Sequence, residues 1–121
     1  MKRMLFLLVA FMGLSMFTST LSAASEAKPK LDGLTFTSKN GDTLDFYSDF
    51  IVYKADGADY SRKGDWSLGG VSSWNGNSAV WRITVNIYVG KNIKTLKGYV
   101  TADRWSGKVW KFELDGQVWR L

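Results

Sequence analysis

Carboxylates are the side chains best suited to do chemistry in this sequence, because it holds no histidine and no cysteine. These absences exclude a histidine general base, a serine–histidine triad, a thiol nucleophile and the usual zinc ligands. Paired carboxylates, as in glycosidases, remain possible. The candidates fall in one stretch: Asp42, Asp45, Asp49, Asp56 and Asp59. Alternation turns Asp45 outward, and Asp42, Asp56 and Asp59 lie where turns favour aspartate, so we expect no enzyme.

The segment Asp56–Asp59, with the sequence DGAD, raises the question of a calcium loop. It lacks the alternating acids and the closing glutamate of such a loop. The chain also has no glycine loop of the kind that cradles phosphate. We therefore expect no metal and no cofactor.

Two tryptophans, Trp74 and Trp105, are the candidate binding residues. Trp74 lies in GGVSSWNGNS and Trp105 in DRWSG, so both are in polar, glycine-containing segments that we predict to be loops, at 69–78 and 103–107. Binding residues often sit on loops over a rigid scaffold. The alternative is that each indole folds back as a lid on the core, and the sequence leaves both interpretations open. The polar residues Asp49, Asn75 and Arg104 complete the predicted binding end.

The N-terminus has the pattern of a secretory signal peptide. Lys2 and Arg3 precede an apolar run, Met4 to Phe17, and small residues follow up to Ala24, where we predict cleavage. The run is shorter than the roughly 20 residues that span a bilayer, so we expect no stable membrane span after cleavage. We expect residues 1–24 to be the signal peptide, 25–32 a flexible leader and 33–121 one domain, secreted or periplasmic in a bacterium.

Period-two alternation predicts strands throughout the domain, and no segment shows sustained helical periodicity. In residues 80–89, for example, Trp81, Ile83 and Val85 share one face. Pairing apolar residues across each turn then fixes a register, because a one-residue slip turns a strand inside out. The predicted strands are 33–39, 43–48, 50–55, 61–68, 79–89, 94–102, 108–114 and 117–121.

The predicted registers place facing apolar residues opposite one another. They also place Gly98 beside Phe112, where a glycine would make room for rings. The predicted pairs are Phe112–Trp119, Trp110–Leu121, Phe36–Phe46, Ile83–Val100, Val100–Trp110 and Trp66–Trp81. By this reasoning Trp110 and Trp119 belong to the core.

Eight sequential antiparallel strands suit an up-and-down meander that closes into a small barrel, with a two-sheet sandwich as the alternative. The 69–78 and 103–107 loops are two connections apart, so they emerge at the same end. The side chains that we predict to point inward are sufficient to fill the lumen and leave at most a shallow mouth. These side chains are Leu34, Phe36, Phe46, Trp66, Trp81, Ile83, Val85, Ile87, Val100, Trp110, Phe112 and Trp119.

The segment YSRKGDW, Tyr60 to Trp66, followed by SLGG, resembles the glycine-x-tryptophan strand of small bacterial secreted lipocalin-like barrels. The exported meander is similar in pattern over most of the domain, while the motif itself rests on Gly64 and Trp66. Lipocalins place this motif in the first strand, whereas here it falls in the fourth of a shorter chain. The resemblance implies a β-barrel that binds rather than catalyses.

We expect an exported, monomeric, non-catalytic binding module that uses the end with Trp74 and Trp105 for a small ligand or glycan. The alternative is a protein–protein module, such as an inhibitor of an extracellular enzyme or an envelope component. Bases alternate with aromatics on the outer face, at Arg82, Tyr88, Lys97, Tyr99 and Lys111. Because an exported protein rarely meets nucleic acid, we expect no nucleic-acid partner.

Overall fold

The structure, a computed structural model, describes residues 27–121 and contains eight β-strands in that range. The expected signal peptide, with its cleavage after Ala24, lies outside the described residues. No helix in the described part of the chain is long and apolar enough to cross a membrane. The strands are β1 (Thr35–Thr37), β2 (Thr43–Phe46), β3 (Ile51–Lys54), β4 (Arg62–Asn75), β5 (Ser78–Val89), β6 (Asn92–Asp103), β7 (Val109–Leu114) and β8 (Gln117–Trp119).

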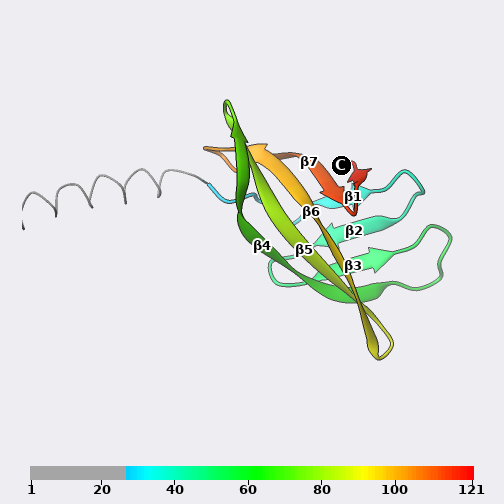
Figure 1. The fold of residues 1–121 in the computed structure, drawn as a ribbon. Coiled ribbons are helices and arrows are strands. Elements are labelled where there is room, and N and C mark those ends of the chain that lie inside the picture. The colour runs from blue at the N-terminus through cyan, green and yellow to red at the C-terminus, as the bar shows by residue number, and fades with distance from the viewer. Residues whose placement is uncertain (1–26) are drawn as a thin grey trace, which may run out of the picture.

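All eight strands form one antiparallel sheet in chain order, which curls until its two edges meet (Figure 1). Thr37 of β1 and Arg120, just after β8, form an antiparallel bridge. Closure removes the unpaired edges that an open sheet would expose. The predicted eight-stranded meander barrel is confirmed, and the strands do not divide into the two sheets of a sandwich.

Two glycines allow the sheet to curl. A Cβ atom added to Gly64 would lie 1.9 Å from the Asn86 carbonyl oxygen, and one added to Gly98 would lie 1.8 Å from the Glu113 carbonyl oxygen. Only glycine permits such a close approach of neighbouring backbones. The predicted role of Gly98, making room for the Phe112 ring, is wrong: Gly98 pairs with Leu114, and the space it leaves is filled by backbone.

The hairpin between β7 and β8 has the predicted register, with Phe112 opposite Trp119. The other predicted registers are wrong, mostly by two residues. Phe36 faces Leu44 instead of Phe46, Ile83 faces Gly98, and Val100 faces both Trp81 and Phe112. A shift of two residues leaves every side chain on the same face of its strand, so apolar facing pairs do not distinguish the two registers.

The turn between β5 and β6 shows how one such shift arises. Val89 pairs with Asn92 around the two residues Gly90 and Lys91, and Gly90 has φ +60°. Glycine adopts positive φ readily, so the chain turns one residue earlier than a turn centred on Lys91 and Asn92 would allow.

Bulges account for the larger departures. β7 carries an extra residue where Thr101 pairs with Lys111 and Ala102 with Val109. The intervening Trp110 is thereby turned outward and is 60% exposed. The assignment of Trp110 to the core is therefore wrong, as is its pairing with Val100.

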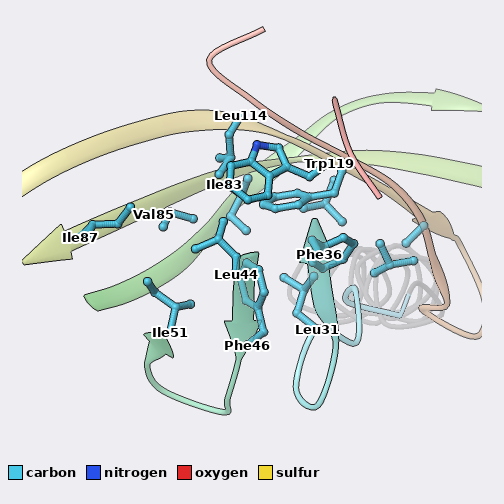
Figure 2. Packing of buried hydrophobic residues seen from close by; sticks show 14 residues of the cluster. Leu31, Phe36, Leu44, Phe46, Ile51, Ile83, Val85, Ile87, Leu114 and Trp119 are labelled. Atoms are coloured by element: carbon cyan, nitrogen blue, oxygen red, sulfur yellow. The ribbon is translucent and has the colours of Figure 1, made fainter. Parts of the chain in front are cut away.

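The barrel core is a cluster of apolar side chains from all eight strands. Phe36, Phe46 and Phe112 pack edge-on or tilted, with ring centroids 4.6–5.6 Å apart. Trp119 is 6% exposed and lies above them, close to Ile83 and Leu114 (Figure 2). Leu31, within the expected leader, is also buried at 1% exposure. Leu34, Trp66 and Trp81 are only partly buried. The remaining predicted core residues are buried: Ile83, Val85, Ile87 and Val100.

Candidate functional site

The predicted loop 69–78 is mostly strand. β4 runs on to Asn75 and pairs with β5 through two bulges, so the connection is only Gly76 and Asn77. Trp74 pairs with Ala79, one residue pair before the end of this hairpin, and is 55% exposed. The prediction of a ten-residue loop, with Trp66 opposite Trp81, is wrong because bulges at the Gly69–Gly70 region and beyond let irregular backbone continue the ladder.

The loop between β6 and β7 lies against this hairpin (Figure 1). The Arg104 amide donates to the Asn77 carbonyl oxygen at 2.8 Å, and its guanidinium donates to the Gly76 carbonyl oxygen at 3.5 Å. The same guanidinium stands 4.9 Å from the centre of the Trp105 ring, which is 53% exposed. We call this region, comprising Trp74, Asn75, Arg104 and Trp105, the tryptophan end.

Asp103 holds the backbone of the Trp105 loop. Its Oδ1 accepts hydrogen bonds from the amides of Ser106, at 2.8 Å, and Trp105, at 2.9 Å. These bonds hold the pKa of the Asp103 carboxyl below its usual value, because they favour the charged form. The loop therefore presents Trp105 on a fixed backbone.

Asp49 lies apart from these contacts, in the turn that joins β2 and β3, and its side chain is exposed. The rings of Tyr47 and Phe50 stack beside it with centroids 4.5 Å apart. The structure thus brings Trp74, Asn75, Arg104 and Trp105 together, while Asp49 belongs to a separate turn.

A second feature lies at the opposite end of the barrel, which we call the turn end because the connections Ser38–Asp42, Ala55–Ser61, Gly90–Lys91 and Asp115–Gly116 meet there. Here the lumen opens as a hollow of about 500 Å³, which we call the mouth. This volume falls within the range of small-molecule sites. Its apolar lining comes from five strand positions and one residue past β3: Ile87, Val89, Leu96, Leu114, Trp119 and Ala55.

The remaining lining of the mouth is polar, and it includes two cations at inward-facing strand positions. Arg62 has the same parity on β4 as the buried Gly64, and Lys94 pairs with the buried Ile87. Both cations therefore occupy inward positions, where a packed barrel would place apolar residues. The other polar lining residues are Asp42, Tyr53, Asp115 and Gln117.

Hydrogen bonds engage the acids of the mouth more fully than its bases. Asp42 Oδ1 accepts from the Asp56 amide at 2.9 Å and Asp42 also accepts from the Tyr53 hydroxyl. Burial, followed by the nearby Asp42 carboxylate, raises the pKa of Tyr53. Arg62 donates to the Tyr60 hydroxyl and stands 5.1 Å from its ring. Within residues 27–121, neither Arg62 nor Lys94 forms an ion pair with a carboxylate.

Sequence reasoning expected at most a shallow mouth and did not identify its lining, although a signal was present. The alternation that turns Leu96 and Val100 inward also turns Lys94 inward, and the alternation through Gly64 and Trp66 turns Arg62 inward. A charged residue at an inward position near a strand end marks the rim of a lumen. Among residues 27–121 no group of three or more acidic side chains could hold a metal ion.

The class that the fold defines is a small eight-stranded antiparallel meander barrel with an open mouth at one end. Comparison of the chain with known protein families, curated proteins and solved structures finds no match in any of the three.

Proposed function

We propose that this protein is a non-catalytic binding module whose mouth holds one small amphipathic molecule, with an apolar body and an anionic head. The observation that carries the proposal is the inward placement of Arg62 and Lys94 above an apolar floor. Charged residues at inward-facing strand positions depart from the pattern that packs a barrel, and such departures are typical of functional sites.

The two parts of the ligand follow from the two parts of the lining. Ile87, Leu96 and Leu114 offer apolar surface, on which burial of ligand hydrocarbon contributes about 25 cal/mol per Å². Arg62 and Lys94 offer charged donors to the head group, and charge-assisted hydrogen bonds are roughly twice as strong as neutral ones. Asp42 already accepts hydrogen bonds from the Asp56 amide and the Tyr53 hydroxyl, so its oxygens are less available to a cationic head group.

Trp119 adds one further feature to the floor. Its indole nitrogen is buried and has no hydrogen-bond partner within the described residues. In Figure 2 this nitrogen lies beside Leu114, which lines the mouth. An acceptor on the ligand that reached it would satisfy a donor whose burial otherwise costs about 1–3 kcal/mol.

The N-terminal sequence pattern and the barrel class support the same proposal. The N-terminal sequence has the pattern of a bacterial signal peptide. We propose a lipocalin-like module that is secreted or periplasmic, with Gly64 and Trp66 in structural roles. In keeping with this, Gly64 is buried and the Trp66 indole donates to the Tyr47 carbonyl oxygen at 2.9 Å. The N-terminal mass of the native protein tests export: cleavage after Ala24 is expected, and an intact residue 1 would contradict it.

The tryptophan end supports a second candidate function, as a contact surface. Trp74 and Trp105 line none of the five hollows described among residues 27–121, and the β4–β5 hairpin projects beyond its neighbours (Figure 1). A projecting surface suits an extended partner better than a small ligand or glycan. The two candidate functions use opposite ends and can be tested separately.

Two fluorescent probes test the mouth. 8-Anilinonaphthalene-1-sulfonate carries an apolar body and an anionic head, and N-phenyl-1-naphthylamine is the same body without the sulfonate. We expect saturable binding of the anionic probe at one site, with weaker binding of the neutral one. Leu96→Glu should abolish binding of both probes, because it places a carboxylate on the apolar floor.

The matched control is Thr95→Glu, which places the same charge on the outward face of β6. It should bind both probes like the unmodified protein, and thermal melting should show that both variants are folded. Equal loss of binding in the two folded variants, or no saturable binding by the unmodified protein, would rule out the mouth as the site.

A further inference from the structure

We infer that the tryptophan end docks on the surface of an anionic lipid bilayer. This inference builds on the proposed contact role of that end and is independent of ligand binding in the mouth. It rests on three observations about the described residues: the exposed indoles, the bases around them, and the place at which the chain enters the barrel.

The indoles are of the type that bilayer interfaces favour. Trp74, near the end of β4, and Trp105, in the β6–β7 loop, are each about half exposed. The Arg104–Asn77 hydrogen bond joins the β6–β7 loop to the β4–β5 connection. An indole at the headgroup level buries its ring while its N–H stays hydrated, which is why tryptophan is enriched there. Two such rings on one rigid end can enter the interface together.

The bases around the indoles complement an anionic surface. Lys28 and Lys30 lie against the Trp105 loop, since a Cβ at Gly107 would be 2.4 Å from the Lys28 carbonyl oxygen and 3.3 Å from Lys30 Cγ. Lys108 follows in the same loop, and all three lysines are exposed. With Arg104 they surround Trp105 with positive charge, and each base near an anionic bilayer strengthens binding about fivefold.

The acids of this region offset only part of that charge. Asp103 Oδ1 accepts hydrogen bonds from the Trp105 and Ser106 amides, and this one carboxylate stands against the four bases. Asp49 is in the β2–β3 turn, and Asp32 is next to Gly33, whose amide bonds to Phe46 at the end of β2. Both of these carboxylates therefore lie on the β2–β3 side of the end, away from the Arg104 loop.

The chain enters the barrel at the same end. The Ala27 amide donates to the Arg104 carbonyl oxygen at 2.8 Å, and the Lys30 amide donates to the Gly107 carbonyl oxygen at 2.9 Å. The first described residues of the chain therefore lie at the tryptophan end and bring the positive charges of Lys28 and Lys30 to it.

Vesicle binding tests this inference. The protein as purified after export is sedimented with phosphatidylcholine vesicles, with and without about one third phosphatidylglycerol, over a salt series. We expect binding only to the anionic vesicles, weakening as salt rises, and quenching of tryptophan fluorescence by brominated lipid. The double variant Trp74→Ser/Trp105→Ser should bind at least about tenfold more weakly, since each indole loses its buried area.

Matched variants distinguish the contribution of the tryptophan end to vesicle binding from that of the rest of the surface. Tyr60→Ser/Ile93→Ser removes two exposed apolar side chains at the turn end and should bind vesicles normally. Lys28→Gln/Lys108→Gln should weaken binding about twenty-fivefold, whereas Lys39→Gln/Lys91→Gln at the turn end should not. Thermal melting of each variant checks the fold.

Failure of the unmodified protein to bind anionic vesicles would overturn the inference. Equal vesicle binding by the double tryptophan variant would also overturn it. A photo-cross-linker placed at position 105 should label lipid, and labelling of a protein instead would likewise overturn the inference. None of these outcomes would bear on probe binding in the mouth, because that site lies at the other end of the barrel.

Discussion

Thr37 and Arg120 exchange two backbone hydrogen bonds, with the Thr37 amide 2.6 Å from the Arg120 carbonyl oxygen and the Arg120 amide 2.8 Å from the Thr37 carbonyl oxygen. This single bridge joins the first strand to the last and closes the barrel. On either side of it the sheet edges are short, because β1 and β8 have three residues each.

Arg120→Pro should therefore destabilise the barrel, since it removes the amide and leaves the Thr37 carbonyl without its partner. We expect a loss of about 1–3 kcal/mol in the free energy of unfolding, measured by chemical denaturation. Arg120→Ala keeps the amide and should stay within about 0.5 kcal/mol of the unmodified protein. Equal stability of the two variants would show that the bridge does not hold the seam.

Gly98→Ala should be among the most damaging small substitutions in the chain. The added Cβ would lie 1.8 Å from the Glu113 carbonyl oxygen and 2.8 Å from Leu114 Cα, so β6 and β7 would have to separate. We expect a loss of about 3 kcal/mol or more. Gly70→Ala, which meets nothing within 4 Å, should change stability by less than about 1 kcal/mol. The comparison fails if both alanine variants melt alike.

The loss of stability on replacing a tryptophan should depend on how deeply that tryptophan is buried. Trp119→Ala should cost about 3–5 kcal/mol, because a buried ring leaves a cavity beside Phe112 and Leu114. Trp110→Ala should cost less than about 1 kcal/mol, because the bulge turns Trp110 into solvent. Trp74→Ser and Trp105→Ser should also cost less than Trp119→Ala. A melting loss at Trp110 as large as that at Trp119 would contradict the bulged register.

The Trp105 loop should depend on pH through Asp103. Hydrogen bonds from the Ser106 and Trp105 amides lower the pKa of this carboxyl from 3.8, so its contribution is present above that pH and is lost as pH falls through the lower folded value. In an NMR titration the Ser106 and Trp105 amide signals should shift with a midpoint below 3.8. Asp103→Asn should remove the transition. A midpoint at or above the usual value would mean that these bonds do not form.

Alternation was enough to predict eight strands, their order and the barrel, because it records which side of each strand faces the core, but it ended β4 at residue 68 although this strand runs to Asn75. It was not enough to predict register. Phe36 opposite Phe46 and Phe36 opposite Leu44 both bury apolar side chains on the same face, and only the turn geometry decides between them.

Irregular backbone was the other feature that could not be predicted from the sequence. Nothing in the composition around Trp110 signals the extra residue that turns it outward, and the polar, glycine-rich segment around Trp74 resembles a loop although it pairs as a strand. The shared end of Trp74 and Trp105 follows from counting hairpins. The mouth required attention to Arg62 and Lys94, two charges at positions that alternation turns inward.

Two lysines of one strand test whether the mouth holds the head of an anionic amphipathic ligand. Lys94 lines the mouth, whereas Lys97 faces outward beside Thr84. Fluorescence titration with 8-anilinonaphthalene-1-sulfonate should show about tenfold weaker binding for Lys94→Gln and unchanged binding for Lys97→Gln, because only Lys94 reaches the head group. N-phenyl-1-naphthylamine should bind both variants alike. Unchanged affinity of Lys94→Gln for the anionic probe, or equal loss in the two variants, would contradict the claim.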